Sequence, residues 1–165
     1  MSCSAACSRR APEQRSIVSA GRRSARRQAV FILYQQDLLE RDWRSAPERT
    51  DTGEIDAYSR SLVLGVAEEH AAIDAVLQAH VAGWSLERLG TLERAILRLA
   101  TYELLWEPGV PEAVAIDEAV GLAKRFCSDE AAALVNGVLG SVAASEKARI
   151  SEIRSSGEPD TRRTT

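Results

Sequence analysis

Residues 91–106, TLERAILRLATYELLW, decide the fold. Apolar side chains recur in this stretch with the spacing of an α-helix. The apolar set is Leu92, Ala95, Ile96, Leu99, Ala100, Tyr102, Leu104 and Trp106. The pattern predicts a central core helix, with Thr91 as its N-cap and Glu93 in its first turn. Pro108, Gly109 and Pro111 end it, because proline cannot continue a helix.

The segments on either side of this helix keep the same periodicity. We expect two helices from residue 54 to Val81, broken near Glu69–His70, and a short helical turn from Ser85 to Leu89. A further helix is predicted from Glu112 to about Phe126, and a last one after a Ser128 cap. Residues 43–53 are predicted to be a loop, and no strand pattern is present. The fold class is therefore all-α, a compact bundle of six or seven helices.

The first helix is predicted to begin near Arg22, with Ser24 as its N-cap. Its apolar stripe comprises Ala25, Ala29, Val30, Ile32, Leu33, Tyr34 and Leu38. Residues 1–21 are small, polar and arginine-rich, so we expect them to be disordered. Residues 145–165 are expected to form a flexible tail. The predicted domain thus spans residues 22–144.

Charge is distributed unevenly along the 165 residues, although the formal net charge is only -3. Residues 1–29 hold seven arginines and one acid, whereas acids dominate the remaining body. Four of these arginines, at 22, 23, 26 and 27, fall at the predicted helix start, where the helix dipole disfavours cations. A sequence that tolerates this arrangement favours an anion-binding role. The alternative is a solvated basic tail.

Several function classes find no support in the sequence. Cys3, Cys7 and Cys127 lack the spacing of a zinc site, so we predict no metal and no cofactor. No nucleotide-binding or hydrolase motif is present, which predicts a protein that is not an enzyme. No apolar run reaches the roughly 20 residues of a membrane span, and no secretory signal opens the chain. We expect a cytoplasmic protein.

Three blocks in register resemble the NusB family over about residues 22–144. The first is RRSAR at residues 22–26, which continues through Ala29-Val30 to Leu33-Tyr34. The second is LERAILRLA at residues 92–100, followed by Tyr102-Glu103-Leu104. The third runs from Val110-Pro111 through VAIDEAV and AKRF to VNGVL at residues 135–139. The resemblance also favours a close-packing role for Gly137, with Asn136 reaching a polar partner.

This resemblance implies a transcription antitermination factor. Such proteins pair with the ribosomal protein NusE, hold boxA-type single-stranded RNA of nascent, mainly ribosomal RNA, transcripts, and act on RNA polymerase. Carried onto this chain, the RNA-binding residues would be Arg22, Arg23, Arg26, Arg27, Lys124 and Phe126. A cationic groove with an aromatic ring is how proteins commonly hold single strands. Glu93 matches a position that faces NusE, where an acid suits a basic partner.

Two other interpretations stay open from the sequence. A related domain precedes RNA cytosine methyltransferases, although this chain carries no nucleotide-binding domain. In the second interpretation, the protein is a helical adaptor that binds only other proteins, and water solvates its arginines. The sequence does not decide between a monomer and a homodimer.

Overall fold

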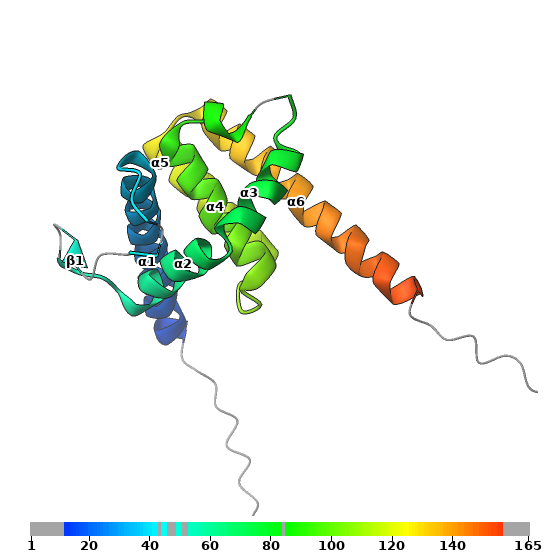
Figure 1. Ribbon diagram of the computed structural model, residues 1–165. Helices are drawn as coiled ribbons and strands as arrows, with labels where there is room; N and C mark the ends of the chain where they lie inside the picture. Colours follow the sequence, from blue (N-terminus) through cyan, green and yellow to red (C-terminus); the bar gives the residue numbers. More distant parts are fainter. Residues whose placement is uncertain (1–11, 43, 46–48, 51–52, 84, 157–165) are drawn as a thin grey trace, which may run out of the picture.

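The structure, a computed structural model, describes residues 12–42, 44–45, 49–50, 53–83 and 85–156. Within them the chain forms six α-helices, one 3-10 turn and one small hairpin (Figure 1). The elements are α1 Pro12–Leu38, β1 Arg49–Thr50, β2 Gly53–Glu54, α2 Ala57–Glu68, α3 His70–His80, η1 Leu86–Arg88, α4 Thr91–Trp106, α5 Glu112–Phe126 and α6 Asp129–Ser156. The prediction of an all-α bundle is confirmed.

Helix α4 forms the centre of the bundle and packs against the other five α-helices. Its buried residues run without a break from Ala95 to Thr101. A helix that is buried on every side in this way is a core helix. Leu99, only 2% exposed, belongs to this core, as the sequence predicted.

Two arginines of α4 anchor it to its neighbours through buried or half-buried ion pairs. Arg94 donates to Asp37 on α1 at 2.8 Å, and Arg98 donates to Asp74 on α3 at 2.8 Å. Arg98 also lies 3.3 Å from Asp37. Polar groups that leave water need such partners, so these contacts fix how α1 and α3 lie on α4.

One glycine of α2 leaves room for the ring of Tyr102 on α4. A Cβ atom at Gly65 would collide with the Tyr102 ring, so any larger residue there requires the ring to move. The resemblance had suggested a comparable role for Gly137. That expectation is wrong, because Gly137 is exposed and a Cβ atom there would meet nothing within 4 Å; Asn136 is exposed as well.

The ends of the outer helices differ from the prediction. Helix α1 begins at Pro12, ten residues earlier than expected, so residues 12–21 are helical and Ser24 is not an N-cap. Proline favours the first position of a helix, where its missing N–H is not needed. Helix α6 continues to Ser156 and extends beyond the other helices (Figure 1), so the tail predicted from residue 145 is helical up to that point. Cys3 and Cys7 lie outside the described residues.

The remaining boundaries agree with the local sequence signals in part. The break at Glu69–His70 is confirmed, and the Ser128 hydroxyl caps α6 by accepting from the Ala131 N–H at 3.1 Å. The cap of α4 is Gly90 rather than Thr91. The predicted loop at 43–53 contains the two-residue strands β1 and β2, paired antiparallel. Leu38, assigned to the apolar stripe, is 56% exposed, because it is the last residue of α1.

Candidate nucleic-acid interface

The four predicted arginines lie well inside α1, beyond its first turn. The helix dipole acts mainly within the first turn, so it does not act on these side chains as the sequence pattern had indicated. Their roles follow instead from what each guanidinium group contacts. These contacts divide the cluster into an inward-facing and an outward-facing part.

Arg26 is the inward-facing member and is only 4% exposed. Its Nε donates to both carboxylate oxygens of Glu103 on α4, at 2.8 and 3.1 Å. The Tyr58 hydroxyl on α2 donates to the same carboxylate at 3.0 Å. Arg26 thus joins α1, α2 and α4 through one buried carboxylate, and its guanidinium group faces that carboxylate instead of solvent.

The protonation equilibria of this cluster are shifted by its burial. Burial raises the pKa of the Glu103 carboxyl group, while Arg26 opposes the rise. Burial, together with the charge of Glu103, raises the pKa of the Tyr58 hydroxyl to about 12. The hydroxyl of Tyr58 therefore stays protonated at neutral pH and remains a donor to Glu103.

Arg22 and Arg23 reach outward but have partners on the protein. The Arg22 guanidinium lies over the Tyr58 ring, 5.3 Å from its centroid. Arg23 donates from Nε and Nη2 to the Glu118 carboxylate on α5, with distances of 2.9–3.1 Å. The Arg23 side chain is 69% exposed, so water weakens this pair and an external anion can compete for it.

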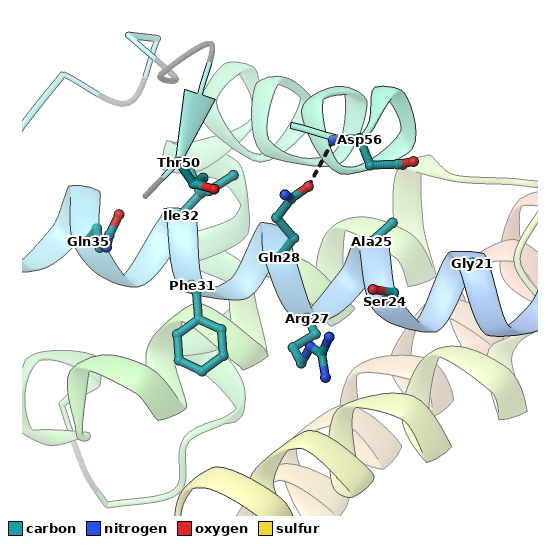
Figure 2. Close-up of a pocket in the computed structure, with 10 residues that line it drawn as sticks. All are labelled: Gly21, Ser24, Ala25, Arg27, Gln28, Phe31, Ile32, Gln35, Thr50 and Asp56. Carbon is teal, nitrogen blue, oxygen red and sulfur yellow. Dashed lines mark hydrogen bonds between the residues drawn. The ribbon is translucent and has the colours of Figure 1, made fainter. Parts of the chain in front are cut away.

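Arg27 is exposed, and no ion pair or hydrogen bond of its guanidinium group is found within the described part of the chain. It lines two grooves. The α1–α5 groove, of about 420 Å³, is formed by Arg23, Ser24, Arg27, Asp117, Glu118, Gly121, Leu122, Arg125 and Phe126. The α1–hairpin groove, of about 750 Å³, is formed by Gly21, Ser24, Ala25, Arg27, Gln28, Phe31, Ile32, Gln35, Thr50 and Asp56 (Figure 2). Arg27 is therefore the cation best placed for a ligand in either groove.

Two phenylalanines meet beside Arg27. The rings of Phe31 on α1 and Phe126 on α5 stand edge to face, with centroids 5.0 Å apart and planes 82° apart. The Arg125 guanidinium lies over the Phe126 ring at 5.3 Å. The pair of aromatic rings at the α1–α5 boundary thus has Arg27 and Arg125 beside it.

Lys124 and Phe126, both predicted for the site, are placed differently. Phe126 lines the α1–α5 groove, whereas Lys124 is exposed and lines neither groove. The neighbouring Arg125 is the cation of α5 that lines it. Sequence reasoning missed Arg125 and Phe31. A signal existed for Phe31, because it follows Arg27 by four residues and so shares its helix face.

Glu93 lies at the start of α4, apart from the residues that line the two grooves. Its carboxylate accepts from the Gly90 N–H at 3.1 Å, which stabilises the first turn. Burial, with the charge of Glu93 as a smaller cause, raises the pKa of the Cys127 thiol, so Glu93 lies near the α5–α6 junction. The helix-start role of Glu93 is visible in the structure, and its role towards a partner is a separate proposal.

The described residues contain neither a cluster of metal ligands nor a membrane-spanning helix. No three His, Cys, Asp or Glu side chains converge there as a metal ion would require. None of the described helices combines the length and apolar character needed to cross a membrane.

The fold and the grooves define a class of protein, the helical bundles that carry a cationic and aromatic surface groove. The sequence profile of the NusB family matches residues 23–144. The chain is 41% identical to the transcription antitermination protein NusB of Bacillus velezensis, covering 73% of this chain and 94% of that protein. It is 42% identical to the protein of the same name from Streptomyces avermitilis, covering 73% and 90%.

Solved structures agree with these relatives. T. maritima NusB superposes with a TM-score of 0.67 at 34% identity, covering 78% of this chain and 96% of that one. A crystal structure of the antitermination factors NusB and NusE in complex with double-stranded RNA matches with a TM-score of 0.60 at 27% identity, covering 75% and 96%. The chain belongs to the NusB family of transcription antitermination proteins.

Proposed function

We propose that this protein acts in antitermination by binding boxA-type single-stranded RNA of nascent, mainly ribosomal RNA, transcripts, together with the ribosomal protein NusE. The observation that carries the proposal is the exposed Arg27 between two grooves, next to an aromatic pair. Exposed cations supply phosphate contacts and aromatic rings supply base stacking, which together bind single strands. The solved complex of NusB and NusE with double-stranded RNA is a precedent, in a relative, for an assembly of this fold with NusE and RNA.

Within this function the cations have different tasks. Arg27 and Arg125 bind phosphate directly, and Arg23 joins them when RNA displaces Glu118. Arg22 contributes charge at the Tyr58 edge of the cluster. Arg26 acts indirectly, because its ion pair with Glu103 holds the part of α1 that carries Arg27. Lys124 adds general positive charge near the end of α5.

The partner-binding part of the proposal rests on Glu93. The chain beyond residue 29 has an excess of acids, which attracts a basic ribosomal protein and repels RNA. An RNA-binding arm and an acidic body suit the assembly of RNA and a basic protein on one surface. Whether the protein is a monomer or a homodimer before assembly does not change this proposal.

The test is a titration of a short single-stranded boxA-type RNA at several salt concentrations, with and without a NusE homologue. We expect affinity to fall steeply as salt rises, because phosphate contacts release counterions. The NusE homologue should tighten RNA binding. A NusE complex that binds RNA no more tightly than NusE alone would instead support the adaptor that binds only protein.

A further inference from the structure

Phe31 is a large apolar side chain on the outer face of α1 and is 36% exposed. Single exposed phenylalanines are common on protein surfaces and need no special explanation. Phe31 differs from that ordinary case in its surroundings. Its ring contacts Phe126, and Arg27 lies one helical turn before it.

The two rings of this pair are not equally available to a ligand. Phe126 is half-buried, and its ring is covered by the Arg125 guanidinium on one side. Phe31 is the more exposed ring, and it contacts Phe126 at right angles. A perpendicular contact fixes the orientation of a ring without covering its whole face.

The side chains of α1 next to Phe31 point to two opposite sides of the helix. Figure 2 shows Phe31 and Arg27 projecting to the same side of α1, whereas Gln28 turns to the opposite side. Gln28 accepts there from the Asp56 N–H at 2.9 Å. Phe31 lines the α1–hairpin groove, Phe126 lines the α1–α5 groove, and Arg27 lines both. Arg27 and Phe31 thus lie on the ridge between the two grooves.

We propose that Phe31 is a base-stacking residue: one unpaired base of a single-stranded RNA that crosses α1 stacks on the Phe31 ring while Arg27 binds an adjoining phosphate. This inference rests on the proposed RNA-binding function and adds a second groove to the RNA path. Phe126 then acts as the positioning residue for the Phe31 ring. A groove of about 750 Å³ lies within the range of pockets, about 300–1,000 Å³, that take small ligands, so it accommodates a nucleotide.

RNA is favoured over a protein partner by the charges beside the ring. Arg27 and Arg125 both lie next to the aromatic pair and would favour an anionic ligand. Every nucleobase has a face that stacks on an aromatic ring, and arginine adds a cation–π contribution. An apolar protein segment would use the ring but not the cations.

The experiment compares Phe31→Leu, Phe31→Trp and the control Leu64→Ala in the full-length protein. Leu64 is 37% exposed and lines neither groove, so its replacement tests loss of an ordinary surface apolar group. The probe is a fluorescein-labelled single-stranded boxA-type RNA, and a series of the same RNA with one abasic position each. Thermal unfolding confirms that each variant is folded.

We expect Phe31→Leu to bind the RNA on the order of tenfold more weakly, the range measured for loss of one stacked base. The slope of affinity against salt should not change, because no phosphate contact is lost. Phe31→Trp should restore affinity, and Leu64→Ala should bind like the wild type. An abasic site at one position of the RNA should lower the affinity of the wild-type protein but not that of Phe31→Leu. The missing base and the missing ring each remove the same stacking contact, so their effects should not add.

The outcomes separate this inference from the function on which it rests. Wild-type affinity in folded Phe31→Leu overturns the stacking role and leaves RNA binding intact. Loss of affinity for the NusE homologue alone, with RNA affinity unchanged, overturns it in favour of a protein contact. If the wild-type protein binds no RNA, with or without the homologue, the proposed function fails and the stacking role fails with it.

Discussion

Arg26 and Arg27 are adjacent residues of the same type, and they face opposite environments. Arg26 is buried against Glu103 and the Tyr58 hydroxyl, inside the contact of three helices. Arg27 points outward between two grooves. The inner face of α1 therefore uses a cation to hold the fold, whereas the outer face presents one to a ligand.

The energetics of the two faces differ accordingly. A buried ion pair contributes little net stability, but removing one partner leaves an uncompensated charge in the interior. An exposed cation can be removed with little effect on folding, because water solvates whatever remains. Stability should therefore report on the inner face, and RNA affinity should report on the outer face.

The largest effect is expected for Arg26→Ala. It leaves the Glu103 carboxylate buried without its charged partner, which should lower the free energy of unfolding by about 3–5 kcal/mol. Urea denaturation measures this loss. The double variant Arg26→Met/Glu103→Leu should recover much of it, because neither charge remains. A loss below about 1 kcal/mol, the range of surface pairs, would mean that the pair is solvated.

Leu99→Ala tests the apolar part of the same inner face. Leu99 is 2% exposed and borders the Arg26–Glu103 pair, so truncation should destabilise the protein by about 2–5 kcal/mol. The measurement is again urea denaturation, with Leu64→Ala as the exposed control. An effect no larger than the roughly ±0.5 kcal/mol typical of surface substitutions would place Leu99 outside the core.

A smaller effect on stability is expected at Glu93, with a larger one on partner binding. Glu93→Lys removes the acceptor of the Gly90 N–H and a favourable dipole contact, each worth roughly 0.5–1 kcal/mol. Affinity for a NusE homologue should fall well beyond that loss, while RNA binding by the protein alone should hold or improve. Glu93→Gln keeps the acceptor and separates the two effects. If Glu93→Lys lowers thermal stability but not partner affinity, Glu93 is only a helix-start residue.

The sequence predicted the inner architecture well. The run from Leu92 to Trp106 is rich in apolar residues at helical spacing, which predicts a core helix, and α4 is that helix. Helix α5 was predicted with the bounds that the structure gives, because Pro111 and Cys127-Ser128 punctuate it clearly. Local signals of this kind need no knowledge of the partner helices.

The sequence predicted the candidate site less well, for a physical reason. Arg26 and Arg27 look alike in the sequence, and only the partner across 77 positions, Glu103, shows which one turns inward. The predicted start of α1 near Arg22 is wrong, because small, polar residues indicate disorder whereas Pro12 suits the first turn of a helix. That error also placed the arginines at the helix dipole. Phe31 lies outside the apolar stripe of α1, and its contact with Phe126 on α5 cannot be read from the local sequence.

The separation of the two faces is tested most directly by the salt dependence of RNA binding by wild-type, Arg27→Ala and Arg88→Ala protein. Arg88 is an exposed arginine of η1 that lines neither groove, so it controls for general loss of charge. Arg27→Ala should keep wild-type stability and bind RNA more weakly. Its plot of log affinity against log salt should be less steep than that of the wild type by about 1, because one phosphate contact is lost. Arg88→Ala should leave the slope unchanged. If Arg27→Ala binds with the wild-type slope, or if both variants lower it equally, the outward face of α1 does not hold the RNA.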